Sequence, residues 1–333
     1  MLKKTALIAV GGNSLIRAGD NGSVGEQQAH ARATSRAVAG LVADSWRLLV
    51  THGNGPQVGA ALLRSERARD ETYPLSLNVC GAATQGEIGY LLQQALGHAL
   101  AERGVERPVA AVLTQVAVSE EDPAFQHPTK PIGPFYTRDE ADDRRRRLGW
   151  TLVETPNGLR RVVPSPEPLE IVEGDIIRAL LDRGVLVVAL GGGGIPVVRR
   201  GNRLVGVDAV IDKDRASALL ATRIRVELFV SLTDVDQVYV DYKQPGERPL
   251  GRVTAAELER YLREGQFPPG SMGPKVEAAL RFLGDGGREV IITSPERLMD
   301  AVAGRAGTHV IGGEVAAEAP VVPATSWGTE PAR

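Results

Sequence analysis

Cysteine, lysine and aromatic side chains are all scarce in this chain of 333 residues. Cys80 is the only cysteine, which excludes an internal disulfide and a cysteine-based metal site. No apolar run reaches the roughly 18 residues that a membrane span needs, and the N-terminus has no apolar signal-peptide core. The formal net charge of −2 gives no electrostatic reason to expect nucleic acid as a partner. We therefore expect a soluble, cytoplasmic protein that binds neither a membrane nor nucleic acid.

Several well-known nucleotide and catalytic motifs are also missing. The chain has no Gly-x-x-x-x-Gly-Lys-Ser/Thr loop, and Gly53-x-Gly55-x-x-x-Gly59 has the wrong spacing for a dinucleotide fingerprint. The five histidines are scattered without metal-ligand spacing, so we predict no metal site built from protein ligands. For His52, at the end of a predicted strand, a catalytic role and a packed structural role both stay open, and we favour the packed one. No arrangement suggests a covalent nucleophile, and phosphoryl transfer needs none.

The distribution of lysine is informative because arginine replaces it almost everywhere. Lys and Arg together number 39, yet only six are lysines. Three of these, Lys130, Lys213 and Lys275, lie in segments rich in Gly, Pro or Asp. A compact ammonium differs from a planar guanidinium, so lysine retained at such positions indicates a specific need for it. We predict that at least two of the three contact phosphate.

Apolar runs that end in glycine turns recur along the chain. Such a run is typical of a buried parallel strand, and the alternation of strand, turn and helix predicts an α/β fold, a parallel sheet with helices on both faces. We predict an edge strand at 308–311. The other predicted strands are 5–10, 47–51, 108–114, 186–190, 226–232 and 289–293, and the main predicted helices are 27–43, 84–103, 175–182, 254–263 and 270–283.

Residues 119–165 are rich in proline, contain the basic run 144–147 and have no long apolar segment. A structureless loop of this length would be unusual in a compact domain, so we predict a small lid or hairpin subdomain outside the sheet. We interpret the arginine run as a solvated face. The rest of 1–313 is predicted to form a single domain, and the tail 314–333 to be disordered at its end.

Glycine turns at helix N-termini are ready anion sites. This chain has four, at 11–12, 53–55, 191–194 and 270–273, and with the lysines they indicate phosphate chemistry. We expect the chemistry in the stretch 186–214, which runs from a buried strand through the four-glycine turn to Asp-Lys-Asp. In 212–214, Asp-Lys-Asp, the aspartates either cap a helix or hold Lys213 for a phosphoryl group, and both roles are compatible. Asp234 and Asp236 follow a strand, where they fit nucleotide contacts and ordinary loop polarity equally well.

Several of these segments together resemble the carbamate kinases of the amino acid kinase family, and the resemblance covers about residues 3–312. The two most specific are Lys-Pro-Ile-Gly-Pro-Phe-Tyr at 130–136 and Arg-Val-Val-Pro-Ser-Pro at 161–166. Segments 60–71 and 78–81 depart from the family pattern. The other matching segments are Gly-Gly-Asn at 11–13, His-Gly-Asn-Gly-Pro-Gln-Val-Gly at 52–59, Thr-Gln-Gly at 84–86, Gly-Gly-Gly-Gly-Ile-Pro at 191–196, Asp-Lys-Asp at 212–214, Thr-Asp-Val-Asp at 233–236 and Pro-Gly-Ser-Met-Gly-Pro-Lys at 269–275.

The resemblance implies an open three-layer α/β/α sandwich with a protruding subdomain, and a homodimer. It implies the reaction ADP + carbamoyl phosphate ⇌ ATP + carbamate with Mg²⁺, ATP-forming in arginine or related nitrogen catabolism. Residues 1–118 and 166–184 would form the carbamate side, and 185–313 the nucleotide side. Two alternatives stay open: a kinase of the same family acting on another small acid, and a non-catalytic paralogue that binds carbamoyl phosphate or ATP.

The resemblance also implies roles for individual residues. Lys213 and Lys275 would neutralise the transferring phosphoryl group, Lys130 would reach carbamoyl phosphate from the lid, and Asp214, with Asp208 as a weaker candidate, would orient the lysines. The implied substrate-binding residues are Gly11, Gly12, Asn13, Gly53 and Asn54, and the implied nucleotide-binding residues are Lys213, Thr233, Asp234, Tyr239, Met272 and Lys275.

Overall fold

The computed structural model describes residues 4–11, 15–16, 19–43, 46–155, 158–268 and 270–313. The predicted tail 314–333 and the implied substrate residues Gly12 and Asn13 lie outside this part of the chain. Within it, none of the helices has the length and apolar character needed to cross a membrane.

An eight-stranded sheet in the order β15-β17-β16-β12-β1-β2-β9-β3 forms the centre of the molecule. The strands from β16 to β3 are parallel, whereas β17 runs antiparallel to β16, so the predicted mostly parallel sheet is confirmed. The predicted edge position of 308–311 is wrong, because the short strand β15 pairs with its outer side. The strands are β1 (Thr5–Val10), β2 (Arg47–His52), β3 (Val109–Ala111), β9 (Leu186–Ala189), β12 (Leu228–Leu232), β15 (Arg252–Thr254), β16 (Glu289–Thr293) and β17 (Thr308–Ile311).

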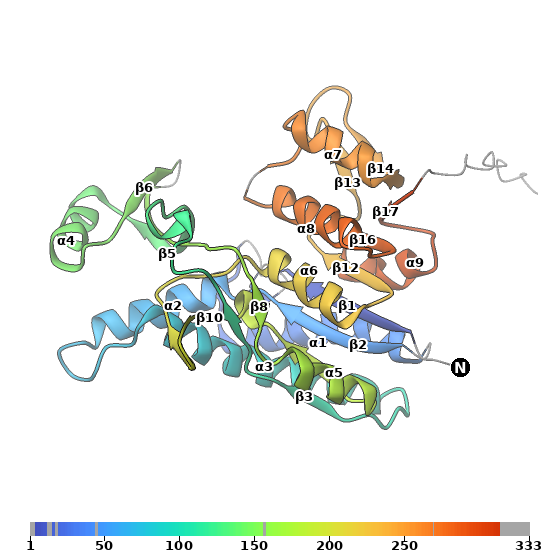
Figure 1. Cartoon of the computed structure of the whole chain (residues 1–333), viewed down its shortest axis with the longest axis horizontal. Helices are drawn as coiled ribbons and strands as arrows, with labels where there is room; N and C mark the ends of the chain where they lie inside the picture. The colour runs from blue at the N-terminus through green and yellow to red at the C-terminus, as the bar shows by residue number, and fades with distance from the viewer. Residues whose placement is uncertain are drawn as a thin grey trace, which may run out of the picture.

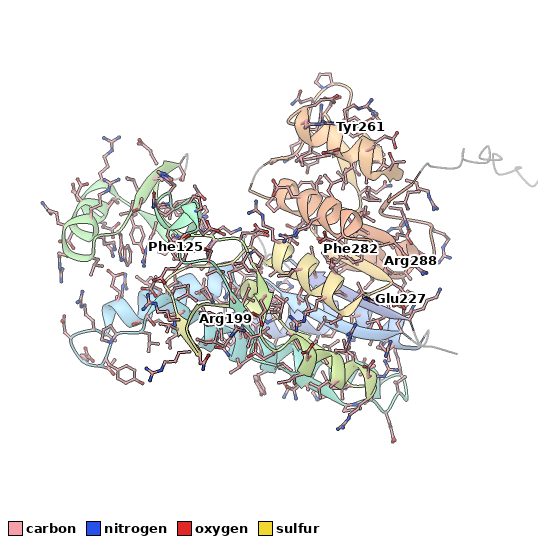
Figure 2. The ribbon with its side chains drawn as sticks, viewed as in Figure 1. Phe125, Arg199, Glu227, Tyr261, Phe282 and Arg288 are labelled. Carbon is pink, nitrogen blue, oxygen red and sulfur yellow. The ribbon has the colours of Figure 1, made fainter. Side chains whose placement is uncertain are left out.

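Helices cover both faces of this sheet (Figure 1), which confirms the three-layer α/β/α architecture. Alternate residues of β1 enter two separate cores: Leu7 faces α6 and α8, and Ile8 faces α1 and α3. In the first core Phe282 of α8 (Figure 2) meets Phe229 of β12 edge to face, with ring centroids 5.7 Å apart. The helices are α1 (Val24–Ala43), α2 (Gly55–Arg67), α3 (Leu77–Ala101), α4 (Arg138–Leu148), α5 (Gly174–Asp182), α6 (Lys213–Ile224), α7 (Ala255–Arg263), α8 (Met272–Gly284) and α9 (Leu298–Val302).

Sequence patterns located most helices but misplaced some ends. Helix α3 begins at Leu77, seven residues before the predicted start at Thr84, because Leu77 and Cys80 are buried despite the weak helical pattern around Gly81. Helix α2 was predicted only as a glycine turn; its Pro56 lies in the first turn, where a missing N–H costs nothing. Thr254 caps α7 with Glu257 in the predicted capping box.

The segment predicted as a lid folds into the three-stranded sheet β5-β7-β6 with helix α4, and it projects from the body beside α2 (Figure 1). We call this unit the lid. Its own small core contains Tyr136, Ala141 and Leu152. The prediction of a solvated arginine run is wrong for Arg144, whose guanidinium lies over the Tyr136 ring at 4.4 Å and pairs with Glu66 of α2. The lid strands are β5 (Lys130–Tyr136), β6 (Leu152–Thr155) and β7 (Gly158–Val163).

Two smaller sheets complete the described structure. One is a four-stranded sheet of order β11-β10-β4-β8, in which β4 precedes the lid along the chain, β8 follows it, and β10 and β11 come after β9. The other is a β13-β14 hairpin that precedes α7. These strands are β4 (Gln115–Ala117), β8 (Glu170–Ile171), β10 (Ile195–Arg200), β11 (Arg203–Gly206), β13 (Val238–Val240) and β14 (Arg248–Leu250).

Candidate functional site

A cavity of about 780 Å³ lies at the carboxyl ends of β1, β2 and β12, where ligands bind in open α/β sheets. The lid contributes one wall, and the starts of α6 and α8 contribute another. Arg160, Ser165 and Arg215 also line it, although sequence analysis did not single them out as site residues. The cavity brings together nine of the residues predicted for the site: Gly11, Gly53, Asn54, Lys130, Lys213, Asp214, Thr233, Asp234 and Lys275.

Three further candidates lie elsewhere. Tyr239 is on β13, with its ring 5.9 Å from that of Tyr242. Met272 opens α8 and packs against the core of that side of the sheet. Asp208 lines a different cavity and accepts a hydrogen bond from the Leu77 backbone N–H at 2.9 Å.

Two lysines share one carboxylate at the centre of the site. Lys213 Nζ lies 2.6 Å from Asp214 Oδ1, and Lys275 Nζ lies 3.2 Å from Asp214 Oδ2. Lys213 and Asp214 form the first turn of α6, and Lys275 comes from the first turn of α8. All three side chains are at most 10% exposed, so these charges are held in a largely desolvated place.

The charges of this cluster do not cancel. Burial alone would raise the pKa of Asp214, but the ammonium groups of Lys213 and Lys275 hold it well below its ordinary value. Burial lowers the pKa of Lys213, and Lys275 adds to this effect while Asp214 opposes it. One ionised carboxylate between two ammonium groups leaves one buried positive charge. A buried charge needs a partner, so the cluster favours an anionic ligand.

Lys130 approaches the same region from the lid. Its Nζ lies 2.6 Å from Asp212 Oδ2, and this ion pair joins β5 to the start of α6. The other oxygen of Asp212 accepts hydrogen bonds from the backbone N–H groups of Asp214 and Arg215, which caps the helix. The helix-cap interpretation is therefore confirmed for Asp212. Its contact with Lys130 joins residues 82 positions apart, and sequence analysis missed it.

The four-glycine turn at 191–194 mainly permits close packing. A Cβ on Gly192 would lie 2.2 Å from Asn54 Nδ2, and one on Gly193 would lie 2.3 Å from the Ile211 carbonyl oxygen. Both residues have positive φ, which glycine adopts without strain. Only Gly192 of this turn lines the cavity. The stretch 186–214 was expected to hold the chemistry: its glycine turn packs against Asn54 and Ile211, and Gly192, Asp212, Lys213 and Asp214 line the cavity.

The two aspartates after β12 differ in their surroundings. Asp234 lines the cavity. Asp236 accepts a hydrogen bond from Ser294 Oγ at 2.5 Å and thus ties the loop after β12 to the end of β16.

Among the residues that the structure describes, no group of three or more His, Cys, Asp or Glu side chains could hold a metal ion.

His52, at the end of β2, is buried and packs against Gly191. Its Nδ1 donates to the Gly53 carbonyl at 3.0 Å, and burial lowers its pKa from 6.5 to about 4. Between these two values the unfolded chain binds a proton that the folded chain does not, so stability falls as the pH drops from 6.5 towards 4. His52 is therefore neutral at neutral pH, in keeping with the interpretation as a packed residue.

We expect His52→Gln to flatten this pH dependence. Between about pH 7.5 and about pH 4.5, the wild-type free energy of unfolding should fall by roughly 2 kcal/mol more than that of the variant, measured by denaturant titration at both values. His127→Gln, exposed in the segment before β5, is the control and should keep the wild-type slope. A wild-type slope in His52→Gln would contradict this account of the buried imidazole.

Known proteins resemble this chain over most of its length. Residues 4–294 match the amino acid kinase family. The chain is 45% identical over 313 residues to a protein named carbamate kinase from Thermococcus kodakarensis, and the match covers 92% of this chain and 99% of the relative. It is 46% identical to the carbamate kinase-like protein YahI of Escherichia coli, covering 93% of this chain and 99% of that protein. The solved structure of carbamate kinase from Giardia lamblia bound to AMP-PNP superposes with a TM-score of 0.88 at 40% identity, covering 94% of this chain and 99% of that one.

Proposed function

The chain belongs to the amino acid kinase family and is a carbamate kinase, and we propose that the cavity described above carries out the transfer ADP + carbamoyl phosphate ⇌ ATP + carbamate. The observation that supports this site is the uncompensated positive charge of Lys213, Asp214 and Lys275. A loose phosphoryl transition state spreads negative charge over its oxygens, and fixed positive charges in a dry site stabilise it. We further propose that the enzyme works in the cytoplasm and makes ATP in the catabolism of arginine or related nitrogen compounds.

Each group has a defined part in this mechanism. Lys213 and Lys275 neutralise the transferring phosphoryl group between the two substrates. Asp214 holds both ammonium groups through contacts at 2.6 and 3.2 Å, which keeps them separated and directed towards the phosphoryl group. Carbamoyl phosphate binds on the side of the cavity lined by Gly11, Gly53 and Asn54, to which the resemblance adds Gly12 and Asn13. The Gly53 N–H donates to the Val10 carbonyl at 3.1 Å and takes no part as a donor to the ligand. The nucleotide lies towards Thr233 and Asp234 of the cavity and, by resemblance, towards Tyr239 and Met272, which lie outside the cavity lining.

Mg²⁺ accompanies the nucleotide in this proposal. Mg²⁺ commonly uses one or two carboxylates together with substrate phosphates and water, so it needs no cage of protein ligands. Asp234 lines the cavity and would supply such a carboxylate. When bound, the ion neutralises charge on the nucleotide phosphates, and Lys213 and Lys275 remain the protein's own contribution to that task.

A panel of phosphoryl donors and acceptors tests the proposal against its rivals. Purified protein with ADP and Mg²⁺ should form ATP from carbamoyl phosphate but not from acetyl phosphate, in a coupled luminescence assay. ATP consumption with N-acetylglutamate or aspartate, and none with carbamate, would instead identify a different acid as substrate. Binding of ADP by calorimetry without turnover on any donor would favour the non-catalytic paralogue.

Lys130→Ala should lower kcat by about a hundredfold with the fold retained. Its ammonium is the only lid charge that pairs with the start of α6 among the described residues, and we propose that it moves from Asp212 to carbamoyl phosphate when substrate binds. Coupled ATP synthesis measures the loss, and circular dichroism measures the fold. Arg146→Ala, on exposed α4, is the control and should stay near wild type. An unfolded Lys130→Ala variant would make Lys130 a structural residue instead.

We also propose a homodimer formed through the outer face of α3 beside the edge strand β3. Tyr90 and Leu113 are both more than half exposed there, and a shallow cavity lined by Tyr90, Gln94 and Gly97 runs along the helix. A charged side chain buried in an apolar interface costs free energy, so Tyr90→Asp should separate the subunits. Light scattering should give twice the 35.4 kDa chain mass for the wild type and the mass of one chain for the variant. Tyr73→Asp, exposed outside this face, should leave the mass unchanged. A monomeric wild type would contradict the proposal.

A further inference from the structure

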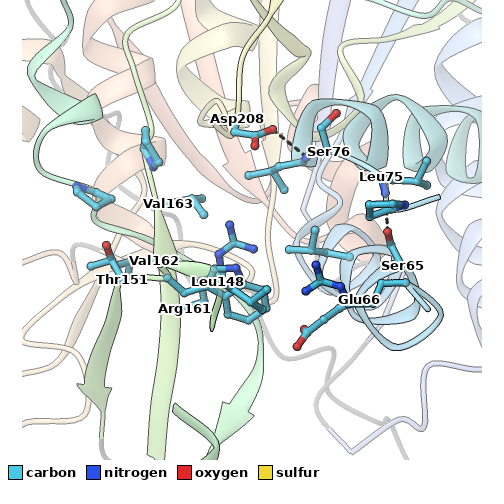
Figure 3. A pocket seen from close by; sticks show the side chains of 18 of the residues that line it. Ser65, Glu66, Leu75, Ser76, Leu148, Thr151, Arg161, Val162, Val163 and Asp208 are labelled. Atoms are coloured by element: carbon cyan, nitrogen blue, oxygen red, sulfur yellow. Dashed lines mark hydrogen bonds between the residues drawn. The ribbon is translucent and has the colours of Figure 1, made fainter. Parts of the chain in front are cut away.

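A second cavity, of about 440 Å³, lies between strand β7 of the lid and the end of α2 (Figure 3). Its walls are the end of α2, the segment 74–77 before α3, the turn 148–151 of the lid and strand β7. Successive residues of β7 face different cavities: Arg160 lines the substrate cavity, and Arg161 lines this one. The lid strands therefore separate two cavities, and the proposed function uses only the first.

The charged groups of this second cavity are incompletely paired. The Arg161 guanidinium lies over the Trp150 ring at 4.1 Å, and within the described part of the chain it has neither a hydrogen-bond acceptor nor an ion pair. Burial lowers its pKa, and the nearby carboxylates of Asp208 and Glu66 oppose this effect without forming an ion pair with it. Glu66 Oε2 is fully buried and has no donor among the described residues, while Oε1 lies 3.4 Å from Arg144 Nε.

The lining charges are balanced in sign. Arg69 and Arg161 are positive, and Glu66 and Asp208 are negative. Most of the other lining residues are apolar, and Ser65, Ser76 and Thr151 are polar. The apolar ones include Leu62, Leu75, Leu77, Phe125, Trp150, Val162 and Val163.

We propose that this cavity binds a small zwitterion with an apolar side chain, of the neutral α-amino acid class. Its carboxylate would accept from Arg161, its ammonium would donate to Glu66, and its side chain would contact the apolar wall around Leu75 and Trp150. Such a ligand supplies both missing partners at once. A simple anion would satisfy Arg161 but would lie near Glu66, and a simple cation would leave Arg161 unpaired. The balanced lining charge favours the zwitterion over either.

The same strands connect this cavity to Lys130. In the β5–β7 ladder Lys130 pairs with Val163, and Ile132 pairs with Arg161. At the next residue of β5, the Gly133 backbone touches α2 so closely that a Cβ on Gly59 would lie 2.5 Å from the Gly133 Cα. A ligand held between α2 and β7 would thus fix the strand that carries Lys130. We infer that its binding changes carbamoyl phosphate turnover, a step that rests on the proposed function.

Calorimetry without substrates tests the binding site independently of any activity. L-Leucine should bind the full-length wild type with a dissociation constant of about 1 mM or tighter. 4-Methylpentanoate, which lacks the ammonium, and 3-methylbutylamine, which lacks the carboxylate, should each bind at least about tenfold more weakly, because each loses one charge-assisted contact. Absence of saturable leucine binding, or equal binding of either probe, would overturn the zwitterion assignment.

Two variants locate the site. Arg161→Gln and Glu66→Gln should each weaken leucine binding by about tenfold or more, and Arg146→Gln, on the exposed face of α4, should leave it unchanged. The isosteric Glu66→Gln keeps the conclusion testable if Arg161→Gln destabilises the lid, which a thermal melt would reveal. Unchanged leucine binding in both folded variants would place the ligand elsewhere and overturn the proposal.

A kinetic arm tests the coupling. Saturating leucine should change the KM for carbamoyl phosphate at least about twofold in the wild type and leave it unchanged in Glu66→Gln, because the ligand fixes the strand that positions Lys130. Leucine binding with unaltered kinetics would overturn the coupling. Leucine binding to a protein that makes no ATP would contradict the proposed function but would still support the second binding site.

Discussion

Lys213→Met is expected to lower kcat by about a thousandfold, the loss seen when a fixed charge-stabilising donor is removed from a transition state. The variant keeps the Asp214–Lys275 ion pair, in which the remaining charges cancel. Its stability should therefore equal or exceed that of the wild type, because the uncompensated buried charge is gone. Coupled ATP synthesis measures kcat, and denaturant titration measures the free energy of unfolding.

Lys243→Met is the matched control for this result. Lys243 lies in an exposed turn and does not line the cavity, and its replacement should leave kcat within about twofold of wild type, as for most surface substitutions. A Lys213→Met enzyme within tenfold of wild-type kcat would remove Lys213 from the catalytic role. An unfolded variant would show instead that Lys213 is needed for the first turn of α6.

Asp214→Asn is expected to reduce both activity and stability. Without the carboxylate, Lys213 and Lys275 would face each other as unpaired buried cations, and losing one partner of a buried pair costs about 3–5 kcal/mol. The free energy of unfolding at neutral pH should fall by about this amount, and kcat by at least a hundredfold. Added inorganic phosphate should raise the melting temperature of the variant more than that of the wild type, because the anion replaces the missing charge.

Two further variants separate this effect from general damage. Asp182→Asn removes the partner of Arg47 in an exposed ion pair and should cost less than about 1 kcal/mol. Adding Lys213→Met to Asp214→Asn should restore part of the lost stability, since it removes one of the two repelling charges. A double variant no more stable than Asp214→Asn would show that repulsion between the lysines is not the cause.

How much the sequence revealed depended on the range of each interaction. Apolar runs followed by glycine predicted the parallel sheet, because strand burial leaves a local signature. Lys130, Lys213 and Lys275 stood out because the chain otherwise favours arginine, and the structure brings all three to one cavity. These features could be recognised without knowing which residues meet in space.

Long-range contacts were not predictable in the same way. The Asp212–Lys130 ion pair depends on how the lid meets α6, and no local pattern encodes that. The close packing of the four-glycine turn against Asn54 and Ile211 also depends on distant segments, and only the packed structure reveals it. The unpaired side of Glu66 in the second cavity likewise depends on burial by a segment distant in sequence.

Phosphorus NMR of a mixture of carbamoyl phosphate, ADP and Mg²⁺ tests the central claim most directly, because it follows the transferred group itself. With catalytic amounts of the enzyme, the carbamoyl phosphate signal should be lost as the signals of ATP grow in equal amount, and Lys213→Met should slow this exchange by about a thousandfold. Formation of inorganic phosphate alone, at the rate seen without protein, would contradict the account of Lys213, Asp214 and Lys275 as a phosphoryl-transfer site.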